Sequence, residues 1–162
     1  MMDSKDFITR VIAAEELKNS EKLEAMKFSD FSYFCYGGAR TEALNIIDTS
    51  NGTNFGSMFY NCSSLTNLTL YNIRKSITIG SGTSWGHLLT VDSLVHTIQE
   101  LCAASSSQTL TMGSANLNKI ANIYCKVIDG SNEKKPMELC ESTDEGAMTL
   151  TAYANMKNWN LA

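Results

Sequence analysis

The chain has 162 residues and a mass of 17.8 kDa, a size typical of a single domain. Hydrophobic residues make up 43% of it and charged residues 19%, a globular composition that excludes a wholly disordered chain. Lysine and arginine number 13 against 17 acidic residues, and no basic cluster occurs, so we expect no nucleic-acid partner.

The apolar runs and the cysteines indicate in which compartment we expect the protein. No apolar run approaches the roughly 20 residues that cross a bilayer, so we expect no membrane span. Residues 1–18 carry acids where a signal peptide carries bases, so we expect a protein made in the cytoplasm without a signal peptide. The five cysteines include no Cys-x-x-Cys pair. We therefore expect no bound metal or cofactor, and thiols that are reduced and buried.

The N-terminal part has a helical pattern. Ser4 is a candidate N-cap, and Phe7, Ile8 and Val11 follow at helical spacing. We expect residues 1–27 to form a helical cap over one end of the core. The alternative is a helix that mediates assembly or lies on a membrane surface.

An aromatic-rich stretch follows at residues 28–40, and its aromatic residues all precede Gly37-Gly38. Aromatic side chains near a glycine turn can line a sugar-binding cleft. More often such residues pack the edge of a core, and we favour that interpretation.

Strand signals come next. Residues 43–48 form a short strand candidate, and an Asn51-Gly52 turn follows it. Apolar and polar residues then alternate, and the apolar side chains are expected to face the core at Leu65, Leu68, Leu70 and Ile73. A strand is also predicted at 77–79. The glycine-rich loop after it lacks the Gly-Lys-Ser/Thr of a phosphate-binding loop.

The second half of the chain alternates between predicted helices and strands. Thr90 is a candidate N-cap for the first of these helices. In chain order we predict a helix over 91–103, a strand over 108–113, a helix over 116–128, a polar connection over 129–146, a strand over 147–152, and a helical turn with a tail over 153–162.

A short motif recurs along the chain. Residues 109–111 and 149–151 both read Thr-Leu-Thr, 40 residues apart, and residues 68–73 are a looser copy. Recurrence of this kind is typical of stacked repeats, in which each unit buries its apolar face against the next.

Residues 54–73 resemble a unit of the BspA-like leucine-rich repeats of bacterial surface proteins. The residues that match the family pattern are Met58, Phe59, Cys62, Ser63, Ser64, Leu65, Leu68 and Leu70. Residues 93–162 are similar to the C-terminal regions of repeat proteins encoded in bacteriophages and prophages of gut Firmicutes, with Lys157-Asn158-Trp159 where Lys-Gly-Trp is usual. The resemblance implies a parallel-stranded solenoid and a binding or structural role in a phage tail or host-recognition apparatus. It carries no catalytic motif.

These observations predict an α/β fold. We expect a short leucine-rich-repeat-like solenoid with a small parallel sheet, flanking helices and an N-terminal helical cap. Residues 1–27 would be the cap and residues 28–162 the leucine-rich-repeat-like domain, both around a single core.

The expected function is a non-enzymatic repeat module, associated with a phage or prophage and carried on the virion, that binds a protein or a cell-surface glycan. Exposed tryptophan and tyrosine side chains are frequent anchors at interfaces. The candidate ligand-binding residues are Tyr71, Trp85, His87 and Trp159. The alternative for each of them is packing at the end of the solenoid.

Two other functions stay open. One is a purely structural, homo-oligomeric subunit of a phage particle, because an open sheet edge recruits partners. The other is a hydrolase that uses His87 or His96, with Asp92 four residues before His96. No Gly-x-Ser-x-Gly motif accompanies these residues, so we predict no catalytic residue.

Overall fold

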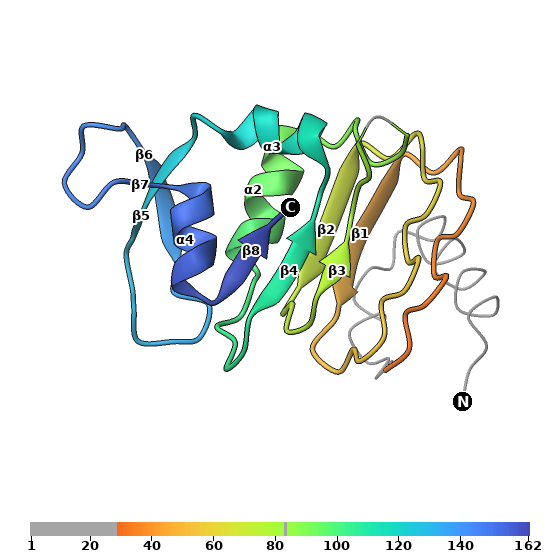
Figure 1. The fold of residues 1–162 in the computed structure, drawn as a ribbon, viewed down its shortest axis with the longest axis horizontal. Helices are drawn as coiled ribbons and strands as arrows, with labels where there is room; N and C mark the ends of the chain where they lie inside the picture. The colour runs from red at the N-terminus through yellow and green to blue at the C-terminus, as the bar shows by residue number, and fades with distance from the viewer. Residues whose placement is uncertain (1–28, 83) are drawn as a thin grey trace.

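The computed structural model describes residues 29–82 and 84–162 (Figure 1). The helical cap predicted over residues 1–27 lies outside these residues. The described part is an α/β structure in which one cluster of buried hydrophobic side chains draws on residues from Phe31 to Leu161.

Three helices and eight strands make up the described part of the chain. In order they are β1 (Ala43–Asp48), β2 (Asn67–Tyr71), β3 (Ile77–Thr78), α2 (Val91–Gln99), β4 (Gln108–Thr111), α3 (Ser114–Ile120), β5 (Tyr124–Val127), β6 (Met137–Cys140), β7 (Met148–Thr149), α4 (Leu150–Met156) and β8 (Trp159–Leu161).

The strands form three small sheets. β1 and β2 pair in parallel, with Leu44 beside Leu68 and an irregularity between Leu44 and Ile47. β3, β4 and β8 form a second parallel sheet in that order, so the last strand of the chain returns to pair with β4. β5 pairs antiparallel with both β6 and β7. In Figure 1 the molecule extends from the orange segments beside β1 to β5, β6 and β7 at the opposite end, and the C-terminus at β8 lies between them, beside β4.

Ahead of β1, a non-strand segment is stacked on a later one in the same parallel sense. The backbone nitrogens of Phe31, Tyr33 and Cys35 donate to the carbonyl oxygens of residues 54, 56 and 58, at 2.8, 3.0 and 2.7 Å. Each donor therefore meets an acceptor 23 residues further along the chain. This stacking satisfies backbone groups that a buried turn would otherwise leave without partners.

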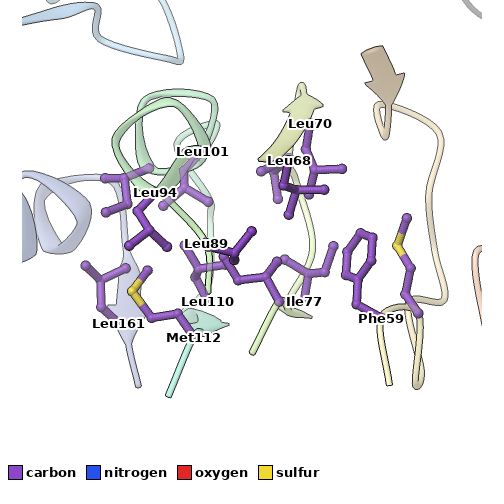
Figure 2. Packing of buried hydrophobic residues seen from close by; sticks show 14 of the residues in the cluster. Phe59, Leu68, Leu70, Ile77, Leu89, Leu94, Leu101, Leu110, Met112 and Leu161 are labelled. Carbon is purple, nitrogen blue, oxygen red and sulfur yellow. The ribbon is translucent and has the colours of Figure 1, made fainter. Parts of the chain in front are cut away.

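The alternating apolar residues face the core as predicted. Leu65, Leu68, Leu70 and Ile73 are each at most 1% exposed. Figure 2 shows how leucines from β2 and α2 meet side chains from β3, β4 and β8 in the same layer, with Phe59 at one side. Burial of one such leucine contributes about 1.5–3 kcal/mol to the free energy of unfolding, so this layer is a main source of stability.

The predicted leucine-rich-repeat-like solenoid with one small parallel sheet is wrong. The described strands divide among three separate sheets, and the third of these is antiparallel. Alternation of apolar residues specifies which side chains face the core, but it does not specify which strand pairs with which. The polar residues 129–136, predicted only as a connection, turn the chain back so that β6 lies antiparallel to β5.

Element types also differ from the prediction in three further places, one of which is β8, a strand in the segment predicted as a tail. The helix predicted over 116–128 ends at Ile120, and its second half is β5, where pairing with two strands outweighs a helical spacing. The strand predicted over 147–152 is only β7. The chain then enters α4 because the Thr149 hydroxyl accepts a hydrogen bond from the Ala152 nitrogen at 3.2 Å. Thr90 caps α2 as predicted.

A buried lysine joins the C-terminal turn to α2. Lys157 is fully buried, and its Nζ donates to the carbonyl oxygens of Ile98 (3.4 Å), Gln99 (3.1 Å) and Leu101 (2.9 Å). The same nitrogen lies 4.0 Å from the centroid of the Tyr153 ring. A helix C-terminus and an aromatic face both favour a cation. Burial outweighs them and lowers the pKa of Lys157 to about 7.

Lys157 makes stability depend on pH. Because the unfolded lysine has a pKa of about 10.4, the unfolded chain above neutral pH binds a proton that the folded chain does not. From about pH 7 to about pH 9, the free energy of unfolding of the native chain should therefore rise by about 2 kcal/mol relative to that of Lys157→Met. Urea unfolding across this range measures the difference. Lys75→Met, at an exposed lysine, should follow the native chain, and parallel curves for native and Lys157→Met would contradict the prediction.

Candidate functional site

Four aromatic side chains form a continuous row on the surface, which we call the aromatic stripe: Tyr33, Tyr36, Tyr60 and Trp85. Neighbouring ring centroids lie 5.5 Å apart for Tyr33 and Tyr36, 5.1 Å for Tyr36 and Tyr60, and 5.9 Å for Tyr60 and Trp85. The three tyrosines are 56%, 54% and 46% exposed, whereas Trp85 is 8% exposed. The stripe therefore has a buried tryptophan at one end and exposed tyrosines along the rest.

Stacked turns of the backbone position the tyrosines. Tyr33 and Ser57 occupy corresponding places in two stacked turns, and both have a left-handed backbone, with φ of 58° and 53°. Such a conformation is uncommon for residues other than glycine. The Gly37 nitrogen donates to the Tyr60 carbonyl at 2.9 Å, which fixes the second turn beneath the first and sets Tyr36 on Tyr60. The stripe is therefore held by the backbone and not by its rings alone.

The ring contacts decide which surface the stripe offers. Tyr36 and Tyr60 are stacked with an angle of 15° between their planes, and each also contacts a second ring. The two middle rings thus use much of their faces on neighbours. These two rings therefore expose mainly their rims and their phenol hydroxyls to solvent. Together these offer both apolar area and hydrogen-bonding groups.

Two side chains of α3 hold the loop that carries Trp85 and His87 by hydrogen bonds to its carbonyl oxygens. The Asn116 side-chain nitrogen donates to the Gly86 carbonyl at 2.8 Å and to that of Met112 at 2.8 Å. Lys119 Nζ donates to the His87 carbonyl at 2.6 Å. His87 itself is half-buried, and its Nδ1 is buried without a hydrogen-bond partner among the described residues.

The structure does not bring the four sequence-predicted site residues together. Trp85 belongs to the stripe, and His87 lies two residues beyond it on the same loop. Tyr71 is half-buried on β2 and forms a T-shaped contact with the His96 ring, at 5.2 Å between centroids. Trp159 is 1% exposed, and its Nε1 donates to the Cys102 carbonyl at 2.8 Å, so it packs in the core. Ligand binding by these residues stays a prediction.

Sequence reasoning missed the three tyrosines of the stripe. In the aromatic-rich stretch, Phe31 and Phe34 pack in the core as favoured, but Tyr33 and Tyr36 point to solvent. The overlooked signal is a spacing: a phenylalanine precedes a tyrosine by five residues at both Phe31 and Phe55. Those two phenylalanines also stack, with centroids 5.2 Å apart.

His96, one of the histidines considered for hydrolysis, already has a partner, and so does the neighbouring Ser93. His96 Nε2 lies 3.1 Å from the Leu70 carbonyl oxygen, which requires that this nitrogen carry the proton and donate it. The Ser93 hydroxyl oxygen accepts a hydrogen bond from the Leu68 nitrogen at 3.0 Å and another from the Thr90 hydroxyl at 3.0 Å. In the described part of the chain no hydrogen bond joins Asp92 to His96. The expectation of a non-enzymatic protein stays a prediction.

The cysteines lie in the described residues, and no disulfide links them. The Cys62 thiol donates to the Cys35 carbonyl at 2.8 Å; hydrogen bonding with Cys35, together with burial, raises the pKa of Cys62. A thiol with a raised pKa forms little of the reactive thiolate.

Across residues 29–82 and 84–162, no group of three or more His, Cys, Asp or Glu residues is placed to hold a metal ion. Within the same ranges, no helix has the length and hydropathy of a membrane span.

Asn116 should be essential to the loop that holds Trp85. In Asn116→Leu the buried carbonyls of Gly86 and Met112 lose their donor, and we expect the free energy of unfolding to fall by about 2–4 kcal/mol. Asn118→Leu, at an exposed position of the same helix, is the matched control and should change it by less than about 0.5 kcal/mol. Denaturant unfolding measures both. Equal effects of the two substitutions would show that the buried amide is not what fastens the loop.

Comparison with known proteins identifies no relative: no family model, no curated protein and no solved structure matches this chain.

Proposed function

We propose that this chain is a non-catalytic recognition module that docks a protein partner through the aromatic stripe. The observation that carries the proposal is the stripe itself: three tyrosines, each close to half exposed, held in one row by stacked turns. Tyrosine and tryptophan are enriched among the residues that dominate the energy of protein interfaces. Their few rotatable bonds also keep the entropic cost of binding low.

The geometry favours a protein over a glycan at the stripe. A sugar ring stacks best on an aromatic face that is open to solvent, but Tyr36 and Tyr60 each contact two neighbouring rings. Rims and hydroxyls suit the mixed apolar and polar contacts of a protein surface, where a hydroxyl hydrogen-bonds to a backbone carbonyl or amide. The buried Trp85 contacts Tyr60 at one end of the row and adds little contact area of its own.

The setting we propose is a phage or prophage, with this module on the virion as a part that recognises a host. Support comes from the residues that resemble BspA-like repeats and phage-encoded repeat proteins, Met58 to Leu70 and Lys157 to Trp159. In the structure these residues mostly pack the core: Met58, Phe59, Cys62, Leu65 and Trp159 are all at most 1% exposed. These residues therefore support the proposed relationship to phage-encoded repeat proteins, whereas the stripe supports the proposed binding function.

A second function, a structural subunit that self-associates, is favoured by one observation. β6 is an edge strand of the antiparallel sheet and carries Leu139, which is 57% exposed. An edge strand with exposed apolar residues is a template for pairing with another chain. Sedimentation of the native chain beside Leu139→Lys distinguishes this function, because only self-association through β6 is lost in the variant.

The stripe can be tested by removing its middle rings. We expect the purified chain to bind saturably to a protein from the bacterial envelope, and Tyr36→Ala with Tyr60→Ala to weaken that binding by about tenfold or more. Surface plasmon resonance on separated envelope proteins and on a glycan array measures it. Ile128→Ala removes an exposed apolar side chain elsewhere and should bind as the native chain does.

Two outcomes contradict the proposal. One is binding that the double tyrosine variant retains in full. The other is binding that glycosidase treatment of the envelope fraction abolishes and protease treatment does not. Circular dichroism must show that the double variant is folded, which we expect because ring stacking contributes only about 0.5–1.5 kcal/mol per pair.

A further inference from the structure

A cleft lined mainly by residues with polar side chains lies between the β1–β2 sheet and the first turns of α2, and none of the stripe residues lines it. Its volume is about 410 Å³. Pockets that hold small ligands run from about 300 to 1,000 Å³, so this one suits a ligand of one or two small rings. The residues that line it are Ala43, Asn45, Asn67, Leu68, Thr69, Asp92, Ser93 and His96.

The lining offers both donors and acceptors of hydrogen bonds. The Asn45 side-chain oxygen accepts from the Thr69 hydroxyl at 3.2 Å, which leaves the Asn45 amide hydrogens for a ligand. The Asn67 side-chain nitrogen donates to the Thr66 hydroxyl at 3.0 Å, which leaves the Asn67 oxygen as an acceptor. Asp92 adds an exposed carboxylate, which accepts only.

The charge of the cleft selects against anions. Asp92 is the one carboxylate among the described residues that line it, and no lysine or arginine is among them. A phosphate or an acidic sugar would meet a negative charge there with no cation to offset it. Neighbouring hydroxyl groups on one ring each donate and accept, so they match a carboxylate placed beside two amides. We propose that this cleft binds one neutral saccharide unit.

The walls of the cleft are fixed before a ligand arrives. The Ser93 hydroxyl accepts from the Leu68 nitrogen at 3.0 Å, and His96 Nε2 donates to the Leu70 carbonyl at 3.1 Å, so α2 is fastened to β2 at two points. The Thr90 nitrogen also donates to the Thr66 carbonyl at 2.9 Å. A site held in this way loses little conformational entropy when it binds.

The same lining binds a sugar without cleaving it. Hydrolysis of a glycosidic bond ordinarily needs two carboxyl groups on opposite sides of that bond. Of the described residues in the cleft, only Asp92 carries one. His96 cannot replace the second group through Nε2, because that nitrogen already donates to a backbone carbonyl.

The test is an NMR titration of the ¹⁵N-labelled chain with glucose, galactose, mannose and N-acetylglucosamine. At least one should shift the amide signals of residues 43–45, 67–69 and 92–96 saturably, with a Kd in about the millimolar range, as expected for so small a ligand. Glucuronic acid and inorganic phosphate should not. If none of the four neutral sugars binds there, or if an anion binds more tightly, the proposal is wrong.

Two variants connect the binding to the cleft. Asp92→Asn keeps the size of the side chain and removes its charge, and Thr69→Val keeps the shape and removes the hydroxyl that orients Asn45. Each should raise the Kd for the sugar by about tenfold, since hydrogen bonds to charged groups are the stronger ones. Glu145→Gln, at an exposed acid outside the cleft, should leave the Kd unchanged. Full affinity in both cleft variants would overturn the proposal.

Failure here and failure of the protein-docking function are distinguishable. The double substitution Tyr36→Ala with Tyr60→Ala should weaken protein docking by about tenfold or more and leave the sugar titration as in the native chain. Loss of sugar binding in that folded double variant would place the saccharide at the stripe and contradict the cleft.

Discussion

The parallel stacking of early segments on later ones is the constraint on which both candidate surfaces depend. The turn from Phe31 to Gly37 donates backbone hydrogen bonds to carbonyls 23 residues later, so that corresponding residues of the two turns lie 24 apart, and β1 pairs with β2 at offsets of 24 and 23. Like residues therefore come to lie on like residues. Phe31 meets Phe55 inside, and Tyr36 meets Tyr60 outside. One backbone arrangement sets the inner layer and the outer row together, so the stripe needs no scaffold of its own.

The cleft draws on the same arrangement at a different place. β1 and β2 present polar side chains to solvent between their buried leucines, and α2 closes the side of the groove through contacts to the backbone of β2. Beyond α2 the structure is closed by the C-terminal turn, where Lys157 and Trp159 bond to carbonyl oxygens at and just after the end of that helix. A buried cation there is costly in free energy, and three carbonyl acceptors and an aromatic face offset that cost in part. The helix that walls the cleft is thus anchored at both ends.

The sequence predicted the buried core residues better than it predicted the residues of the two candidate surfaces. Alternation predicted that Leu65, Leu68, Leu70 and Ile73 would be buried, and the capping chemistry of Thr90 predicted where α2 begins, because both depend on neighbours within a few residues. Strand pairing depends on residues far apart in the chain. That is why the predicted solenoid with a single parallel sheet was wrong, and why residues 124–127 form a strand inside a helical spacing. The stripe was missed for the same reason, since no single segment contains it.

The two tryptophans show why residue type alone cannot find a site. Both were predicted to bind a ligand, yet Trp159 is enclosed by the core and bonded through its indole nitrogen, whereas Trp85 contacts Tyr60 at one end of a row of exposed tyrosines. The difference arises from what each packs against and not from the indole itself. Substitutions in this molecule therefore differ in how many features they disturb. A change at Leu68 would disturb the core layer and the cleft together, because this buried residue of β2 also lines the cleft. Changes at Tyr60 or Asp92, which are exposed, alter one surface each and leave the stacked backbone in place.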